Sequence, residues 1–440
     1  MDEDPPVGTC MSSLLRLPPL AALLPFAGLI AGEPPPRDWI DAQTGHRVIR
    51  LSPDEGAGTL YFHQHAFTPE GDQVVLRGRQ GMIAVDISRL GLEAPRPRLI
   101  SKASPITTAW RTREVYYLDR AASALMAVHL DTQAARTVVK LPPQARGNQV
   151  AVNCDETLLV GIGPDPDGPT IPRQPPPEDP GTGGSLRAQW AAGTPKMIYT
   201  VHLRTGEFKV LHRENDWTNH LQCSPTDPQQ ILFCHEGPWH WVDRTWTIRA
   251  DGGPARLLHE RTMNMEIEGH EFFSKDGRMV WYDLQTPKSG VFWLAGVDLA
   301  TGRRIWYHHE RAEWSVHYTV SYDGQLFAGD GGGPASVAAY TMAGEPIAGG
   351  NGQWIYLFRP RLAKGSSFRD QRALIDVGYF KSERLVDMAN HNYSKDGGVE
   401  PNLHFTRDGK WIIFSGNFHS RLPNGRGLTH AYAVAVAKSP

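Results

Sequence analysis

The stretch HEFFSKDGRMVWYD, residues 270–283, decides the fold. It consists of a short apolar strand, a Ser-Lys-Asp-Gly turn and a second apolar strand. Two close copies of it are HYTVSYDGQLFAGD (317–330) and NLHFTRDGKWIIFS (402–415). Looser copies are QHAFTPEGDQVVLR (64–77), QVAVNCDETLLVGI (149–162), HLQCSPTDPQQILF (220–233) and the degenerate TTAWRTREVYYLD (107–119).

Most copies are followed by another strand and a second turn, as in WTIRADGGPARLL (246–258), so each unit contains four strands. The units recur about every 40 to 50 residues apart from two insertions, which is typical of a propeller repeat. The sequence therefore predicts an all-β fold, a seven-bladed β-propeller that occupies residues 33–440 as one domain. A sandwich or a pair of barrels does not explain the repeated turn.

Both ends of the chain are expected to complete the ring. Residues 41–51 look like the outer half of a repeat, and residues 430–437 look like inner or middle strands of the last blade. Joining them in one blade leaves no open sheet edge. Of the two insertions, residues 163–197 are rich in Pro and Gly and are predicted to be a loop. Residues 343–399 contain the second insertion, with a helix-compatible stretch at 369–377.

Composition and the N-terminus limit the possible functions. With 45 basic and 47 acidic side chains, the chain has no electrostatic footprint for nucleic acid or an anionic membrane. Residues 13–32 are strongly apolar, but their three prolines make a poor spanning helix. We expect residues 1–32 to be an export signal starting at Met11, and the mature protein to be periplasmic without a membrane span. A disordered leader on a cytoplasmic protein is the alternative.

The repeat register predicts a ring of polar side chains in the central channel. The innermost strand of each blade lines that channel, and its side chains alternate in direction. The position four residues before the Ser or Thr of the turn, or the equivalent residue, is polar in all seven units: Gln64, Thr107, Gln149, His220, His270, His317 and Asn402. A single histidine is more often a structural core residue, but three at one register that converge on a channel indicate a site.

A metal site is predicted near the last repeat. Glu400, Asn402 and His404 share one face of a strand by period two, and His391 lies just upstream. Together with His317, the residues His391, Glu400 and Asn402 form a mixed nitrogen and oxygen ligand set. Such a set without a thiolate suits Mn²⁺ better than structural zinc.

Several blocks of sequence resemble the oligogalacturonate lyase family. They are WIDAQTGHRVIRLS, LYFHQHAFTPEG, NHLQCSPTDP, FCHEGPW with VDRTW, HEFFSKDG, the His317 strand ending in GDG, and EPNLHFTRDGKWIIF. The resemblance runs from about Trp39 to the C-terminus, with the leader and the 163–197 loop outside it. It implies a seven-bladed propeller enzyme that cleaves short pectin fragments by β-elimination with Mn²⁺.

The resemblance also implies residue roles. The general base of the family corresponds to His270, its assisting arginine to Arg244 and one metal histidine to His317. Where the family has a Gln followed by His-Pro-His, this chain has His391 and then Glu400-Pro401-Asn402, and the adjacent His404 can substitute for one ligand. This departure leaves the metal and the exact uronide open.

The residue types suit the elimination of a 4-linked uronate. A neutral His270 can remove the C5 proton, and Arg244 is expected to hold the uronate carboxylate by forked hydrogen bonds and to keep the imidazole neutral. Predicted substrate contacts are Gln64, His220, His235 and Trp239. The alternatives are a lyase for another uronate polymer and a non-catalytic ligand-binding propeller, because this fold hosts many functions. For the segment 233–246 the alternative is a Trp-rich blade contact with an Asp243–Arg244 ion pair.

Overall fold

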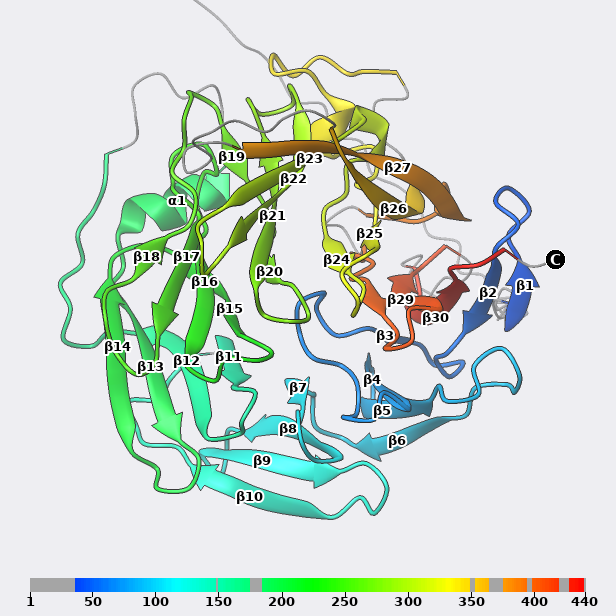
Figure 1. Ribbon diagram of the computed structural model, residues 1–440. Helices are drawn as coiled ribbons and strands as arrows, with labels where there is room; N and C mark the ends of the chain where they lie inside the picture. The colour runs from blue at the N-terminus through cyan, green and yellow to red at the C-terminus, as the bar shows by residue number, and fades with distance from the viewer. Residues whose placement is uncertain are drawn as a thin grey trace, which may run out of the picture.

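Each repeat folds into one antiparallel sheet, and the sheets stand around a common centre in the computed structural model of the chain (Figure 1). The structure describes residues 36–147, 149–174, 184–348, 353–363, 375–393, 398–418 and 427–438. The expected leader, residues 1–32, lies outside this part of the chain. Within it, no helix is both long enough and apolar enough to cross a membrane.

Blades one to four are four-stranded meanders, which confirms four strands per unit. From the inside outwards, blade one contains β3 (Ala57–Gly58), β4 (Gln73–Gly78), β5 (Gly81–Asp86) and β6 (Pro97–Ser101). Blade two contains β7 (Thr107–Thr108), β8 (Glu114–Asp119), β9 (Ala124–His129) and β10 (Ala135–Lys140). Blade three contains β11 (Gln149–Val152), β12 (Leu158–Pro164), β13 (Lys196–His202) and β14 (Phe208–Glu214). Blade four contains β15 (Thr218–Cys223), β16 (Gln230–His235), β17 (Thr245–Arg249) and β18 (Arg256–Leu257).

Blades five and six are joined at their outer edges into one nine-stranded sheet. Blade five contains β19 (Ile267–Glu268), β20 (Phe272–Phe273), β21 (Met279–Gln285), β22 (Phe292–Asp298) and β23 (Arg304–His309). Blade six contains β24 (Tyr318–Val320), β25 (Phe327–Gly329), β26 (Trp354–Leu362) and β27 (Ile375–Asp387). The joint is the parallel pairing of β23 with β27, from Arg304 opposite Ile375 to His308 opposite Tyr379.

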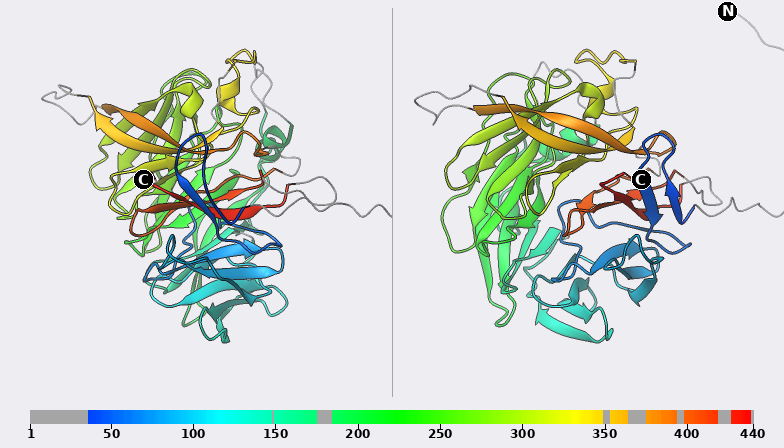
Figure 2. Two further views of the ribbon diagram at one scale, coloured as in Figure 1. Left: turned by 90° about the vertical axis from the view of Figure 1, so that its right-hand side faces the viewer. Right: turned by 45° about the vertical axis from the view of Figure 1, so that its right-hand side comes forward.

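Blade seven combines both ends of the described chain, as predicted. Its strands are β28 (His404–Phe405), β29 (Trp411–Gly416), β30 (His430–Ala435), β2 (Arg47–Arg50) and β1 (Asp38–Ile40). The N-terminal β2 pairs with the C-terminal β30, with Val48 opposite Val434. Figure 2 shows the blue β1 and β2 beside the red C-terminal strand. This pairing closes the ring and leaves β1 as the outer edge of the blade.

The hydrophobic core lies between neighbouring blades. Val74 and Leu76 of blade one pack with Ile413 and Ala433 of blade seven, and all four are fully buried. Each blade is covered on both faces by its neighbours, so the middle strands are almost continuously apolar and buried. This packing fixes the inner strands and therefore the side chains that face the channel.

The insertions differ in part from their predictions. The 163–197 insertion was predicted as a loop, but it contains a helix, α1 (Gly184–Ala192), because a run of Leu, Arg, Ala and Gln favours helix. The helix-compatible stretch 369–377 ends in strand β27, and its residues before 375 lie outside the described chain. Two short 3₁₀ turns also occur: η1 (Arg311–Glu313) connects blade five to blade six, and η2 (Val337–Ala339) lies between β25 and β26 of blade six. The three described cysteines, Cys154, Cys223 and Cys234, are free thiols.

Candidate active site

The three predicted channel histidines converge. His220 lies on β15, His270 lies in the break between β19 and β20, and His317 directly precedes β24. The rings of His220 and His270 are stacked with centroids 5.3 Å apart, and His270 meets His317 at 4.4 Å. Three neighbouring blades thus place one imidazole each at the same end of the channel, as the repeat register predicted.

A segment of blade one, which the sequence did not predict, completes this group. The chain leaves the β-ladder after β3 and makes a turn over residues 61–64, so its side chains reach across the channel. The hydroxyl of Tyr61 lies 3.4 Å from Nε2 of His220 and 3.3 Å from Nε2 of His317. The ring of Phe62 packs on His317 at 4.6 Å. The signals in the sequence were the block LYFHQHAFTPEG (60–71) and the predicted channel residue Gln64, but Tyr61 and Phe62 lie outside the repeat register and were assigned no role.

Of the three channel histidines, His270 is the one with no hydrogen bond to a described residue, a property that it shares with His63 of the blade-one turn, whose pKa burial lowers to about 3. No described residue hydrogen-bonds to either ring nitrogen of His270, and its side chain is partly exposed. Burial, followed by the nearby His317 and His220, lowers the pKa of His270 well below its ordinary value of 6.5. The ring is therefore neutral at pH 7, and a ring nitrogen is free to accept a proton.

Arg244 has a different setting from the expected one. Its side chain is 1% exposed, and its Nε donates to Glu271 (2.9 Å) while one terminal nitrogen donates to Glu236 (3.2 Å). The other terminal nitrogen lies 3.1 Å from Nδ1 of His220. These contacts leave no free fork for a substrate carboxylate, so the expected direct contact is wrong. The predicted alternative, an ion pair with Asp243, is also wrong, because Asp243 pairs with Arg261.

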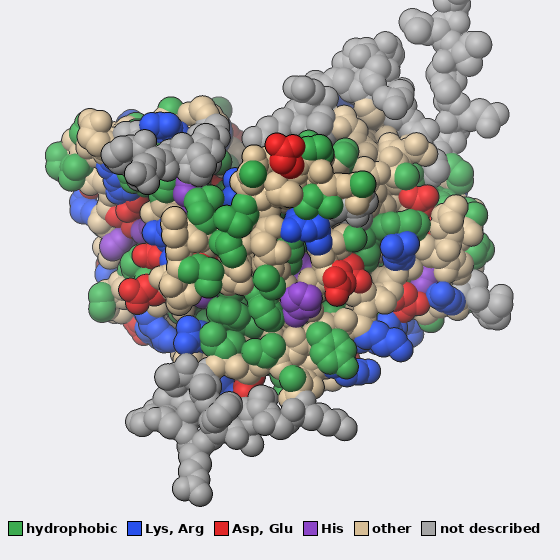
Figure 3. All heavy atoms as spheres, turned by 90° about the horizontal axis from the view of Figure 1, so that it is seen from above, with side chains coloured by type: hydrophobic (Ala, Val, Ile, Leu, Met, Phe, Trp, Pro, Cys, Tyr) green, Lys and Arg blue, Asp and Glu red, His purple; other side chains and the backbone are tan. Residues whose placement is uncertain are grey.

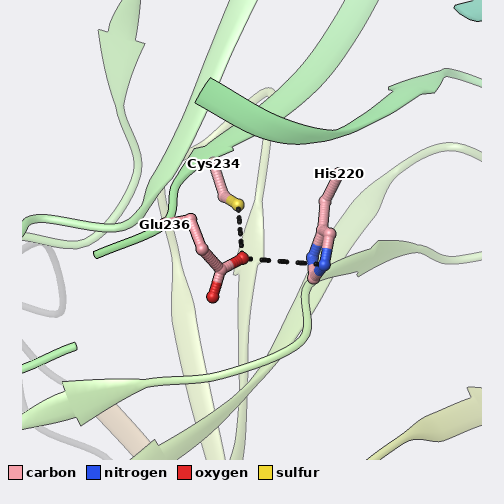
Figure 4. A group of neighbouring side chains, drawn as sticks. All are labelled: His220, Cys234 and Glu236. Atoms are coloured by element: carbon pink, nitrogen blue, oxygen red, sulfur yellow. Dashed lines mark hydrogen bonds and ion pairs between the residues drawn. The ribbon is translucent and has the colours of Figure 1, made fainter. Parts of the chain in front are cut away.

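The buried carboxylates around Arg244 are ionised. Burial alone would raise the pKa of Glu236 and of Glu271, but Arg244 and His220 lower both pKa values to about 2. Figure 4 shows Glu236 between His220 and Cys234, at 3.8 and 3.9 Å. These three groups could hold a metal ion by position. Arg244 contacts both Glu236 and Glu271 and offsets one of their two negative charges, and burial raises the pKa of the Cys234 thiol well above 9.0.

Two of the four predicted metal ligands present suitable atoms. Nδ1 of His317 donates to Asp330 (2.8 Å), which directs the lone pair of Nε2 into the channel. Nε2 lies 3.7 Å from the carboxylate of Glu400, whose side chain is half exposed. Burial lowers the pKa of His317, but the adjacent Asp330 outweighs it and the net pKa is raised.

The other two predicted ligands are bound within the protein. His391 accepts a hydrogen bond from the backbone of Asn417 (3.3 Å) and donates one to the carbonyl of Val399 (2.7 Å), so neither ring nitrogen is free. Oδ1 of Asn402 accepts from the backbone of Phe62 (3.0 Å) and keeps one lone pair. The substitute ligand considered for this site, His404, bonds to the carbonyl of Leu60 (3.1 Å).

Backbone strain occurs at this site. His220 and Asn402 adopt positive φ values of 49° and 52°, a conformation uncommon for residues other than glycine. Such strain costs on the order of 1–3 kcal/mol and concentrates at functional sites, where the surrounding structure enforces it.

Of the three remaining predicted substrate contacts, Trp239 and Gln64 adjoin the channel group and His235 does not. Trp239 donates to Glu236 (3.0 Å) and so adjoins the Arg244 network. Gln64 accepts from the backbone of Tyr61 (3.0 Å) and so supports the turn. His235 lies elsewhere, in a cleft of about 580 Å³ beside α1, where it bonds to Glu214 (2.9 Å). The structure therefore does not bring His235 to the channel histidines.

The outer surface carries no strong charge pattern on the face shown in Figure 3, where acidic and basic side chains are interspersed. This distribution agrees with the net charge of −2. Recognition of a charged ligand therefore depends on particular residues rather than on the overall field.

Comparison with known proteins places this arrangement in a family. A family model described as oligogalacturonate lyase matches residues 37–422. The oligogalacturonate lyase of Dickeya dadantii (strain 3937) is 26% identical over 397 residues, which cover 85% of this chain and 91% of that protein. The oligogalacturonide lyase of Pectobacterium atrosepticum is also 26% identical, over 392 residues, with the same coverage.

Solved structures support the fold. An oligogalacturonate lyase in complex with manganese superposes with a TM-score of 0.67 at 23% identity, covering 91% of this chain and 96% of the other. An oligogalacturonate lyase from Vibrio parahaemolyticus gives 0.68 at 21% identity with the same coverage. The match of the family model over most of the sequence shows that the chain belongs to the oligogalacturonate lyase family and is a lyase.

Proposed function

We propose that the protein cleaves short oligogalacturonides, including saturated and unsaturated digalacturonate, by β-elimination with His270 as the base. The observation that supports this proposal most directly is the state of His270. It is neutral, partly exposed and without a hydrogen-bond partner among the described residues, while His220 and His317 adjoin it. The hydrogen on C5 of a 4-linked uronate is acidified by the neighbouring carboxyl group, so an imidazole is basic enough to remove it.

The reaction needs no attacking water. His270 takes the C5 proton, the C4–O4 bond breaks, and the product has a double bond between C4 and C5. Arg244 acts from behind His220 and does not touch the substrate in this proposal. Its buried positive charge contributes to the low pKa of His270, and its contact with His220 fixes that ring in the channel.

A divalent metal, with manganese as the first candidate, fits His317 and Glu400. Nε2 of His317 and the carboxylate of Glu400 face each other at 3.7 Å, and Asp330 fixes the tautomer of the histidine. The free lone pair of Asn402 is a third possible ligand atom, whereas His391 offers none as placed. When bound, such a metal would stabilise the negative charge that develops on the uronate carboxylate.

The test is elimination by purified protein with Mn²⁺ on saturated and unsaturated digalacturonate, followed through the ultraviolet absorbance of the unsaturated product. His270→Ala should abolish the reaction, and His235→Ala, which removes a histidine outside the channel, should retain it. A panel of other uronides tests the alternative of a different substrate. Binding without product formation on every uronide, with or without metal, would favour a non-catalytic propeller.

We also propose that residues 1–32 direct export to the periplasm. The apolar run 13–32 after Arg16 supports this proposal. Sequencing the N-terminus of protein from the periplasmic fraction tests it. A mature N-terminus near residues 31–33 is expected, and intact protein found only in the cytoplasm would contradict it.

A further inference from the structure

A pocket of about 560 Å³ adjoins the candidate metal ligands on the side of blade one. Glu400 and Asn402 form part of its wall, and Arg77 and Arg79 form another part. Its volume lies in the range of ordinary ligand pockets. Since Glu400 lies 3.7 Å from His317, the pocket opens directly beside the channel group.

The two arginines are not neutralised within the protein. Arg77 donates to the carbonyl of Pro105 (3.2 Å), and Arg79 makes no hydrogen bond or ion pair with any described residue. Both side chains are exposed. Among the residues that line the pocket, Glu400 is the one acidic group. The pocket is therefore locally positive on a molecule whose net charge is −2.

The β-ladder explains why Arg77 reaches the open space. Arg77 on β4 is directly opposite Gly58 on β3, so their side-chain positions lie on one face of the blade. Gly58 presents no side chain next to Arg77, and its own position is tightly packed, since a Cβ there would lie 3.1 Å from Oγ of Ser415. Arg79 lies in the hairpin turn that follows β4, and it also lines the pocket.

From this arrangement we infer that Arg77 and Arg79 bind the carboxylate of a second uronate residue, next to the one that undergoes elimination. The inference rests on the proposed function, because it assumes a uronide chain in the channel. A guanidinium without an ion-pair partner in the protein is suited to forked recognition of a carboxylate. The pocket thus selects oligomers with free carboxylates over neutral or esterified sugars.

The test compares wild-type protein with Arg77→Ala, Arg79→Ala and the double variant on trigalacturonate and on its methyl ester. Each single change should raise KM for trigalacturonate about 2- to 5-fold with kcat unchanged within error, since exposed charge pairs contribute modestly. The methyl ester should be affected little. Arg256→Ala removes an exposed arginine of β18 and serves as the control, with unchanged KM. Arg77→Lys keeps the charge and should recover part of the loss.

Calorimetric binding of trigalacturonate to His270→Ala protein, with and without the arginine changes, separates the two claims. Weaker binding in the double variant without turnover by the wild type would support the pocket and overturn the lyase proposal. An active wild type with unchanged KM in the double variant would overturn the pocket and leave the lyase. No binding of any uronide would overturn both.

Discussion

Replacing Arg244 by Met is expected to destabilise the protein, because it removes the cation that balances the buried carboxylates behind the channel. The substitution leaves Glu236 and Glu271, which are 9% and 0% exposed, without their cation. The fall of the Glu271 pKa from 4.5 to about 2 corresponds to about 3 kcal/mol of stability at neutral pH, and the coupled Glu236 adds to it. Breaking a buried pair from one side costs about 3–5 kcal/mol, so Arg244→Met should lose about that much at pH 7.

The sign of the pH dependence distinguishes this explanation from simple loss of packing. In the wild type both pKa values are depressed, so the stability that they contribute is present above pH 4.5 and is lost between pH 4.5 and about 2. Without Arg244, burial raises the same pKa values above 4.5, and the penalty exists only where the carboxylates are ionised. Acidification from pH 7 to pH 5 should therefore reduce the deficit of the variant.

Urea unfolding followed by tryptophan fluorescence measures this deficit at pH 7 and pH 5, with Arg256→Ala as the matched control. Arg256 is an exposed arginine that donates to one backbone carbonyl, and its loss should change stability little at either pH. A deficit of Arg244→Met that is below about 1 kcal/mol, or that is equal or larger at pH 5, would refute the account of the network.

Three further predictions concern the channel. Asp330→Asn should weaken Mn²⁺ binding about 10- to 100-fold, because Asp330 fixes the tautomer of His317; calorimetry that shows unchanged affinity would exclude this role. The acid limb of kcat/KM should fall below pH 6.5, since the pKa of His270 is lowered; a limb at pH 7 or above would contradict a neutral base. His391→Ala should lower the melting temperature but leave metal affinity within about threefold, because both ring nitrogens bond to the backbone; loss of the metal would restore His391 as a ligand.

Much of the fold could be predicted from the sequence because the repeat is local. A turn such as Ser-Lys-Asp-Gly at 274–277 marks the same register in successive blades, and period two then gives the side that faces the channel. The convergence of His220, His270 and His317 follows from that register. Closure by β2 and β30 follows from the two half-repeats at the ends.

The parts that were not predicted depend on contacts between distant segments. Tyr61 lies outside the repeat register, and it reaches His220 and His317 only because the chain leaves the ladder after β3. The burial of Arg244 depends on Glu236 and Glu271, which the motifs contain but which spacing alone does not place around it. The pairing of β23 with β27 joins strands separated by an insertion that has no repeat pattern.

His391 shows that residue type and sequence position alone do not identify a metal ligand. Histidine near a carboxylate suggested a ligand, but the hydrogen bonds to Asn417 and Val399 give it a structural role. The candidate metal site therefore rests mainly on His317 and Glu400, whereas the sequence pattern gave equal weight to four ligands.

The most direct test of the central claim is the rate of unsaturated product formation from digalacturonate by wild-type protein and His270→Ala, each loaded with Mn²⁺. Loss of a general base costs about 10²- to 10⁴-fold, so the variant should fall by at least 100-fold while its melting temperature stays near that of the wild type. A folded His270→Ala protein that eliminates at the wild-type rate would contradict the assignment of His270 as the base.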